Sequence, residues 1–440
     1  MHTFRLLLLL VPLGALTACS GGGGIREIAV AIPFSAANFL GSPVDNPYFP
    51  LRPGSKFHYE GDTADGRVVI DVEVTTLTRD VFGVTCVVAI FTETIDGELA
   101  EIAEDWFAQD REGNVWYFGE VSNEYENGVV VSTAGSWEAG VNGAEPGIVM
   151  LGAPGLGMRY AQEKAPGVAE DMAKVVGAGS AVTTPLATFR GCLKTEDWNP
   201  LDPGSLENKF YAPGIGTVLE VEKDGSRIEL LRVEYNPPFN PLSFVPGVDH
   251  PLFPLVPGTT YTYEKDTADG LETTEVEVLH ATKVILGVTC VVVRDIVTLD
   301  GDLVEDTLDW FAQDVFGNVW YLGEESKDYE NGVLVSTEGS WEAGVDGAVA
   351  GIIMLASPII GIAYRQEFYA GVAEDMGAVE ALRETVTVPF GTFTDCLKTR
   401  DFTPLEPGVA ERKYYARGVG RILETNDDGE RAELISVATE

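Results

Sequence analysis

Acidic and aromatic side chains are the groups in this chain whose types and spacing could do chemistry. They gather in the segment DWFAQDREGNVWYFGE, from Asp105 to Glu120, which recurs as DWFAQDVFGNVWYLGE from Asp309 to Glu324. A glycosidase needs two carboxyl groups several Å apart across a cleft, often near tryptophan. Acids that have an acidic equivalent in the second half of the chain include Asp105, Asp110, Glu120, Glu138, Glu163, Glu170 and Asp171. Because the chain carries so many acids, solvated faces and turn acceptors explain such pairs more simply. The sequence therefore predicts no catalytic residue, and a carboxylate-dependent hydrolase acting on glycans is kept as the alternative function.

The aromatic residues of these segments indicate a binding surface. Trp106 and Trp116 fall on two strands around one tight turn, so they are expected to be cross-strand neighbours. Together with Trp137 they could line a concave surface that holds an apolar or sugar-like ligand. The candidate ligand-binding residues are Trp106, Trp116, Tyr117 and Trp137 with their equivalents Trp310, Trp320, Tyr321 and Trp341. The alternative is that these aromatic residues fill the core of a β domain.

The sequence gives little support for a catalytic histidine or for a metal or cofactor site. The four histidines are His2, His58, His250 and His280, and none of the last three meets a histidine in the other half of the chain. A Ser-His-Asp or Cys-His arrangement is therefore disfavoured. The acidic segments at Asp62–Gly66 and Asp266–Gly270 lack the ligand order of a calcium-binding loop. No metal and no cofactor is predicted.

The net charge excludes one class of partner. The chain has 69 acidic and 29 basic residues, which gives a formal charge of -40. Such a field repels phosphate backbones, so nucleic acid is not an expected partner. The acids are scattered among predicted strands and turns, as in exported proteins that use carboxylates to stay dispersed.

A tandem duplication organises the chain. A shift of 204 residues superposes Leu51–Tyr235 on Leu255–Thr439 without a gap, and 100 of the 185 aligned pairs are identical. A period of this length indicates a duplicated domain, because solenoid repeats are about 20 to 50 residues long. The segment between the copies, residues 236–254, is rich in proline and predicts a semi-rigid linker.

Each copy reads as strands joined by tight turns. In Arg67–Thr78 apolar and acidic residues alternate, as a half-buried strand requires. Turn signals such as Asp96-Gly97 and Asn127-Gly128 follow, each with an equivalent in the second copy. The stretch Gly167–Val176 permits either a short helix or a strand. The predicted fold class is all-β and mainly antiparallel, with two tandem homologous domains that are each a curved sheet or an open barrel meander.

The cysteines after Cys19 match in pairs between the copies. Cys86 corresponds to Cys290, and Cys192 corresponds to Cys396. One pair per domain in an exported protein predicts two disulfides, Cys86–Cys192 and Cys290–Cys396.

The N-terminus predicts export and anchoring. Residues 1–18 contain a basic residue, an apolar run and small residues, as in a secretory signal peptide. The motif LTACS at Leu16–Ser20 resembles the lipobox of bacterial lipoproteins. The resemblance implies cleavage before Cys19 and lipidation of its thiol, and Ser20 resembles the residue of lipoproteins sorted to an outer membrane. The alternative is an ordinary cleaved signal peptide. The membrane, reached through this lipid, is the predicted partner, and the location is extracytoplasmic.

The end of each copy carries a resemblance of fold. Lys209–Glu234 and Lys413–Ala438 share a Tyr-Ala-x-Gly-x-Gly element and an Asp-Gly turn. They resemble the closing hairpin of exported bacterial domains with lipocalin-like or lipoprotein-carrier-like curved sheets, which implies a fold and no activity. The predicted organisation is a signal peptide over 1–18, a lipidated cysteine and flexible tether over 19–46, a β domain over 47–235, a linker over 236–254 and a second β domain over 255–440. The expected function is that of a lipid-anchored binding module of the cell envelope. A structural or adhesive surface protein is a further alternative.

Overall fold

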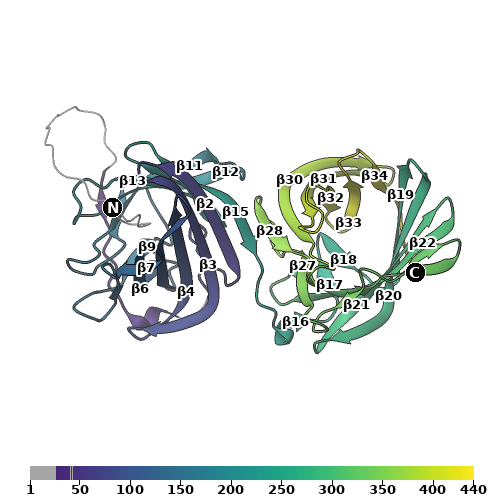
Figure 1. Ribbon diagram of the computed structural model, residues 1–440, viewed down its shortest axis with the longest axis horizontal. Helices are drawn as coiled ribbons and strands as arrows, with labels where there is room; N and C mark the ends of the chain where they lie inside the picture. The colour runs from purple at the N-terminus through teal and green to yellow at the C-terminus, as the bar shows by residue number, and fades with distance from the viewer. Residues whose placement is uncertain (1–25, 40, 42) are drawn as a thin grey trace. The chain divides into compact units, whose positions relative to one another are not determined.

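The computed structural model describes residues 26–39, 41 and 43–440. The predicted signal peptide and Cys19 lie outside the described residues. The chain divides into two compact units, unit 1 and unit 2, whose boundary in the sequence lies between Pro237 and Pro238, and each is described by itself. Figure 1 shows that both are built almost wholly of strands. No helix in the described part of the chain is long and apolar enough to span a membrane.

Unit 1 is one curved antiparallel sheet that leads back to its own first strand. Its main strands are β2 (Ser55–Thr63), β3 (Gly66–Val81), β4 (Val84–Ile95), β5 (Glu98–Gln109), β6 (Val115–Glu126), β9 (Gly147–Met150), β10 (Met158–Ala161), β11 (Met172–Thr183), β12 (Thr188–Trp198), β13 (Glu207–Ala212), β14 (Gly216–Glu222) and β15 (Arg227–Tyr235). The last strand, β15, pairs with β2. Short strands β7 (Val129–Ser132) and β8 (Trp137–Glu138) pair with β6. Among the described residues no ladder joins β9 to β10, so the sheet is not closed into a barrel.

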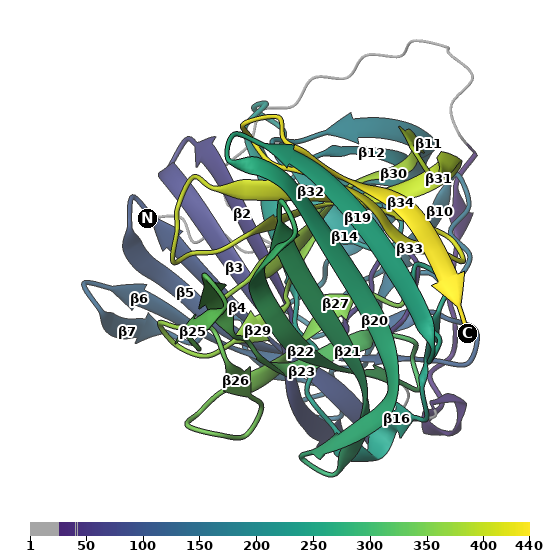
Figure 2. The ribbon, with the colours of Figure 1, turned by 90° about the vertical axis from the view of Figure 1, so that its right-hand side faces the viewer.

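Unit 2 repeats this order. Its main strands are β19 (Thr259–Thr267), β20 (Gly270–Ile285), β21 (Val288–Leu299), β22 (Asp302–Asp314), β23 (Val319–Glu325), β27 (Val349–Met354), β28 (Ile362–Arg365), β30 (Met376–Val388), β31 (Gly391–Phe402), β32 (Ala410–Ala416), β33 (Gly420–Thr425) and β34 (Arg431–Thr439). Shorter strands are β24 (Asp328–Glu330), β25 (Val333–Ser336), β26 (Trp341–Glu342) and β29 (Glu367–Phe368). Strand β34 returns to pair with β19, and Figure 2 shows the long strands of this unit side by side. The predicted all-β, mainly antiparallel fold is confirmed.

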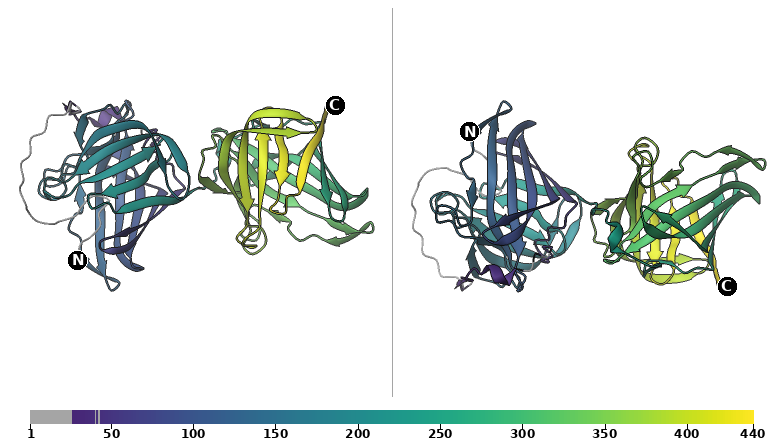
Figure 3. Two further views of the ribbon diagram at one scale, coloured as in Figure 1. Left: turned by 90° about the horizontal axis from the view of Figure 1, so that it is seen from above. Right: turned by 90° about the horizontal axis from the view of Figure 1, so that it is seen from below.

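Alternation and turn chemistry explain the long hairpins. In β3, Val68, Ile70 and Val74 are buried, and the strand turns back at Phe82 and Gly83, whose φ angles are 50° and 80°. Two consecutive residues with positive φ make the tight turn whose twist matches that of paired strands. The stretch that permitted a helix or a strand is extended from Met172 onward. Both views of Figure 3 show how strongly each sheet curves, which leaves an interior for inward side chains.

A short aromatic segment covers the outer side of each sheet. In unit 1 this strap is residues 34–39, where the 3-10 turn η1 (Ala36–Asn38) separates Phe34 from Phe39. Both rings contact Trp116 at 6.0 Å between centroids. Just before the strap, β1 (Ile28–Ala29) pairs with β10. Part of the segment expected to be a tether is therefore held on unit 1.

Unit 2 has the same strap, within the segment expected to be a linker. Phe239 and Phe244 flank the 3-10 turn η2 (Pro241–Ser243) and contact Trp320 at 5.4 and 5.9 Å. Strand β16 (Phe244–Val245) then pairs with β22, and β17 (Val248–His250) pairs with β18 (Phe253–Leu255). Most of residues 236–254 therefore belongs to the fold of unit 2.

The predicted disulfides are wrong. Cys86 lies on β4 and Cys192 on β12, and both are buried free thiols, as are Cys290 and Cys396. Along the sheet, β4 and β12 are separated by β3, β2, β15, β14 and β13. Neighbouring strands lie about 4.8 Å apart, whereas a disulfide needs Cα atoms within about 7 Å. The alignment of the two copies showed which cysteines occupy equivalent positions. It did not show which strands are neighbours in the sheet.

Candidate ligand-binding cavities

The curved sheet of unit 1 lines a partly open cavity of about 150 Å³. Strands β2 to β6 and β13 to β15 supply most of its walls through side chains that alternate inward. The apolar part of the lining includes Phe57, Tyr59, Ile70, Val72, Ala89, Phe91, Ala103, Phe107, Ile215 and Ile228. The polar part is Glu101, Asp105, Tyr117, Glu120, Gln162, Lys209, Tyr211, Thr217 and Glu220. The cavity is therefore an apolar space with a limited set of charged groups on its wall.

A tyrosine and an aspartate form the same hydrogen bond in both units. The Tyr117 hydroxyl donates to Oδ1 of Asp105 at 2.5 Å, and the Tyr321 hydroxyl donates to Oδ1 of Asp309 at 2.5 Å. Burial raises the pKa of Asp105 to about 7, although the bond from Tyr117 opposes that rise. Burial also holds the pKa of Asp309 well above its usual range. Each cavity therefore presents a carboxyl group whose pKa is raised by burial.

A buried lysine is the basic group in the lining of the unit 1 cavity. Lys209 is 4% exposed, and its Nζ lies 2.9 Å from Glu207 and 4.0 Å from Glu220. Burial alone would lower the pKa of Lys209, but these two carboxylates keep it well above its usual range. Its equivalent Lys413 lies 3.0 Å from Asp401. A charged lysine held by acids is thus a shared feature of both interiors.

Next to the unit 1 cavity, carboxyl groups of β4, β5 and β14 cluster in the interior. Glu93 is fully buried, and neither of its carboxyl oxygens has a hydrogen-bond partner. It is paired in the ladder with Glu101, which lines the cavity. Burial, and then the charges of Glu101 and Glu220, raise the pKa of Glu93 to about 9. Burial also raises the pKa of Glu220 to about 8 and that of Glu222 to about 7.

The sheet of unit 2 lines a partly open cavity of about 320 Å³ at the equivalent place. The lining residues that are identical in the two copies include Tyr263, Asp309, Phe311, Tyr321, Glu324, Gln366, Lys413 and Tyr415. Two substitutions change its character, because Asp295 stands where unit 1 has Phe91 and Arg421 stands where unit 1 has Thr217. Charged groups therefore replace apolar and neutral ones on the wall.

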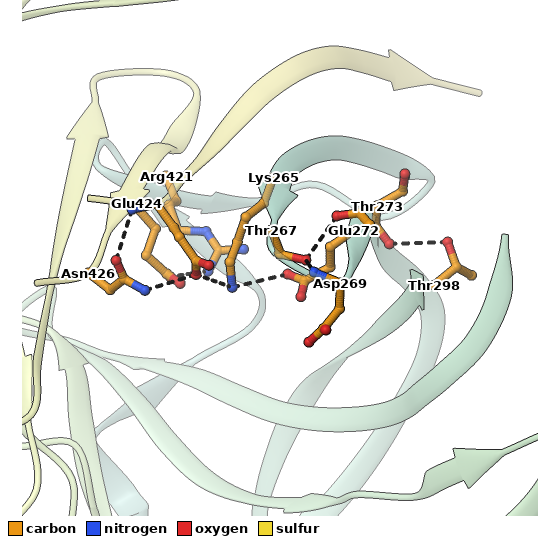
Figure 4. Close-up of polar contacts among 11 residues, drawn as sticks. Lys265, Thr267, Asp269, Glu272, Thr273, Thr298, Arg421, Glu424 and Asn426 are labelled. Carbon is orange, nitrogen blue, oxygen red and sulfur yellow. Dashed lines mark hydrogen bonds and ion pairs between the residues drawn. The ribbon is translucent and has the colours of Figure 1, made fainter. Parts of the chain in front are cut away.

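Arg421 is bound tightly within unit 2. Its Nη1 donates to Oε2 of Glu424 at 2.8 Å, and its guanidinium carbon lies 4.6 Å from the centre of the Tyr263 ring. Burial alone would raise the pKa of Glu424, but Arg421 and the nearby lysines hold it below its usual value. Figure 4 shows Arg421 and Glu424 beside Lys265, whose Nζ lies 3.5 Å from Glu272.

The tryptophans predicted to bind a ligand lie elsewhere. Each is at most 7% exposed, and none lines either interior cavity. These are Trp106, Trp116, Trp137, Trp310, Trp320 and Trp341. Trp116 and Trp320 lie under the straps, and Trp106 and Trp310 lie under Arg79 and Lys283 at 3.8 and 3.2 Å. Trp106 and Trp137 also border a separate hollow of about 280 Å³. Their burial favours the core alternative, while Tyr117 and Tyr321 do line the cavities.

Trp137 and Trp341 support the cavity wall from behind. The Trp137 ring meets the Tyr117 ring edge-on at 5.4 Å, and its Nε1 donates to Glu163 at 3.3 Å. In unit 2, Nε1 of Trp341 donates to Glu367 at 2.7 Å. These two tryptophans therefore fix the positions of groups that face the ligand space.

The acids that recur in both copies of the sequence fall into two groups, those that line the cavity and those that do not. Asp105 and Glu120 line the cavity. Asp110 instead accepts from the indole of Trp116 at 2.8 Å and from the turn that follows it. Glu138 pairs with Arg79, and Glu170 accepts from the backbone of a turn. The described residues include no group of three or more His, Cys, Asp or Glu side chains that could hold a metal ion.

Sequence reasoning missed the residues that differ most between the cavities. Phe91/Asp295 and Thr217/Arg421 are pairs in which a charge appears at an inward position of an otherwise apolar strand. A search of the duplication for such charge changes at buried positions would have found them. Lys209 and Gln162 are identical in the two copies, but identity over half of the aligned positions does not distinguish them.

Comparisons with known proteins add little. No protein-family model matches the chain, and no curated protein matches it. Among solved structures, a crystal structure from Parabacteroides distasonis ATCC 8503, provisionally described as a lipoprotein, is 13% identical and is matched over 43% of this chain and 98% of its own. Its TM-score of 0.25 is too low to carry an argument.

Proposed function

We propose that each unit binds a small organic molecule in its interior cavity and that the protein is a non-catalytic binding protein of the bacterial cell envelope. One observation carries this proposal: a lysine, buried in unit 1 and partly buried in unit 2, and buried carboxyl groups face a cavity in each unit. Burying ionisable groups costs stability unless they are paired. A stable fold alone does not require such groups around a space, and shifted pKa values of this kind are typical of functional sites.

The hydrolase alternative has one observation in its favour, the pKa of Asp105 near 7, since a general acid needs a raised pKa. The size of the space counts against it. A cavity of about 150 Å³ is comparable to one that admits benzene, and a glycan chain is larger. A purely structural role offers no account of the lined cavities. Small-molecule binding therefore has the stronger support.

The lipobox-like motif supports the proposal of lipid anchoring at Cys19 on an extracytoplasmic membrane face, and in a double-membraned host Ser20 favours the outer membrane. The test is fractionation of cells that express the full chain or its Cys19→Ala variant. Anchoring predicts that the full chain partitions with membranes and takes up an acyl label, while the variant is released as soluble protein. Release of both forms would contradict anchoring.

Ligand binding is tested by a thermal-shift screen of the soluble body, Ser20–Glu440, against small amines, acids, alcohols and aromatic compounds. A true ligand raises the melting temperature as its concentration rises above Kd. The Ala103→Leu variant fills the unit 1 cavity, because Ala103 lies on its wall. A unit 1 ligand should lose its effect on this variant and keep it on Val129→Ala, an exposed control. Shifts that are the same on both variants would argue against the unit 1 cavity as the site.

A further inference from the structure

One of the differences between the two cavities indicates which kind of chemical group can occupy the cavity of unit 1. In unit 2 the Arg421 side chain lies inside the cavity, with Tyr263 on one side and Glu424 as its ion-pair partner. In unit 1 the equivalent residue is Thr217, whose side chain is too short to reach as far. Tyr59 and Glu220, the equivalents of Tyr263 and Glu424, both remain on the cavity wall.

The backbone around this position is the same in both units. Thr217 pairs with Tyr211 in the β13–β14 ladder, and Arg421 pairs with Tyr415 in the β32–β33 ladder. The Tyr59 hydroxyl donates to the carbonyl of Thr217 at 3.1 Å. In unit 2 the Tyr263 hydroxyl donates to the carbonyl of Arg421 at 2.9 Å. The ring and the acid of unit 1 are therefore held in the arrangement that accepts a guanidinium in unit 2.

The neighbouring lysine does not prevent a second cation. Nζ of Lys209 lies 4.0 Å from Glu220, and Nζ of Lys413 lies 3.9 Å from Glu424. Unit 2 thus holds a lysine and an arginine around one carboxylate. Unit 1 has the same lysine at nearly the same distance, but none of its described residues places a second cation beside Glu220.

A separate observation also points to a ligand with N–H groups. Oε1 of Gln162 is buried on the wall of the unit 1 cavity without a hydrogen-bond partner, and the residue is 5% exposed. Leaving a buried acceptor unsatisfied is costly, and an N–H donor in the cavity would satisfy it. Part of the wall is apolar, because Phe91 stands where unit 2 has Asp295 and Ile228 lies on the wall as well.

We propose that the unit 1 cavity binds a small organic cation whose guanidinium or ammonium group lies between Tyr59 and Glu220, where unit 2 places Arg421, with an apolar body against Phe91 and Ile228. A cation over an aromatic ring and beside a carboxylate gains from both contacts once water is excluded. The volume of about 150 Å³ limits the ligand to a few heavy atoms beyond the charged group. This inference rests on the proposed binding function and names the ligand class of one cavity.

The test compares n-propylguanidinium with n-propylurea, which has a similar shape and no charge. Titration calorimetry on the soluble body at pH 8 should show that the cation binds at least tenfold more tightly than the urea. Glu220→Gln should weaken binding of the cation at least tenfold and leave binding of the urea unchanged. Thr217→Ser should retain binding and serves as the control for any change at this position.

A reciprocal exchange between the units gives the sharpest result. Thr217→Arg places the chain's own guanidinium in the site, so it should abolish binding of the cation in unit 1. Arg421→Thr opens the equivalent site in unit 2 and should create a second binding event. Circular dichroism and the melting temperature verify that each variant is folded. Unchanged binding by folded Thr217→Arg would overturn the inference.

The outcomes separate this inference from the broader proposal. Equal binding of the cation and the urea, with loss of both in Ala103→Leu, would overturn the preference for a cation and support a binding cavity in unit 1. Binding of neither probe would overturn the inference by itself. The broader proposal is then decided by the thermal-shift screen and its cavity-filling variant.

Discussion

Arg421 donates a 2.8 Å hydrogen bond to Glu424 inside unit 2, whereas the equivalent acid of unit 1, Glu220, has Thr217 at the position of that arginine. The consequence is visible in the acids themselves. The pKa of Glu424 is held below its usual value, while burial raises the pKa of Glu220 to about 8. The substitution of Thr217 by Arg421 is thus accompanied by opposite pKa shifts of the equivalent acids.

Removal of Arg421 should destabilise unit 2 at pH 8. Arg421→Thr leaves Glu424 and Asp295 near each other without this cation, and losing a hydrogen bond between charged groups in this partly buried pair costs about 1.5–3 kcal/mol. The loss should be smaller at pH 5, where these carboxyl groups can take up protons. Urea unfolding followed by tryptophan fluorescence at both pH values measures the change. Arg417→Thr is an exposed control for loss of an arginine, and an equal effect of the two variants would contradict the role of the Arg421–Glu424 pair.

The stability of unit 1 should fall as pH rises from about 5 to about 9. Glu93 has a folded-state pKa raised to about 9 from an ordinary value of 4.5, and Glu220 one raised to about 8. A carboxyl group with a raised pKa binds its proton more tightly in the folded state. Its contribution is therefore complete below pH 4.5 and is lost as pH rises through the folded-state value. The midpoint of urea unfolding, measured across this range, should decrease toward alkaline pH.

Glu93→Val should reduce that pH dependence and stabilise unit 1 at pH 8. Val297 is the equivalent residue in unit 2, so the fold accepts valine at this position. Replacing a buried polar group that has no partner should gain about 1–3 kcal/mol. An unchanged slope of stability against pH in this variant would show that Glu93 does not titrate as described. Glu98→Val, at an exposed strand end, is the matched control.

The four cysteines of the soluble body should react as thiols. Denatured protein prepared without reductant should give four equivalents with a thiol reagent, because Cys86, Cys192, Cys290 and Cys396 are all free. Native protein should react slowly, since burial raises the pKa of Cys86 and Cys290 to about 12. Reductant should leave the melting temperature unchanged. A mass lower by two or four hydrogens would reveal the disulfides that the structure excludes.

The straps should contribute to the stability of each unit. Phe39→Ala removes a half-buried ring that contacts Trp116 and Phe118 at 6.0 and 5.5 Å, and the expected cost is about 1–3 kcal/mol. Phe244→Ala should have a comparable effect on unit 2, through Trp320. Urea unfolding with near-ultraviolet circular dichroism measures both. Leu242→Ala, in the same segment but 91% exposed, should cost little, and a similar loss there would argue against ring packing as the cause.

Strand positions were predictable because their signals are local. Alternation in β3 and the positive-φ turn at Asp96 and Gly97 depend on neighbouring residues only. The straps were missed for a specific reason. Phe39 and Phe244 are 205 residues apart, whereas the rest of the repeat is offset by 204, so an alignment without gaps ended before it reached them.

The site was less predictable because its residues meet through the curvature of the sheet. Asp105 and Tyr117 were both singled out by the repeated segment, and they do form a hydrogen bond. Lys209 lies on β13 and Gln162 follows β10, so both are far along the chain from that segment. No local pattern links them to it. The tryptophans were predicted to bind a ligand because of their residue type. Residue type alone does not tell which face of a strand lies toward the cavity.

The offset of the straps has a consequence for the history of the gene. Since Phe239, Phe244 and Phe253 pack on unit 2 as Phe34, Phe39 and Phe49 pack on unit 1, the duplicated segment began before Leu51 and included these rings. A recombinant fragment that starts at Leu255 would lack the two rings that contact Trp320, whereas one that starts at Pro238 would keep them.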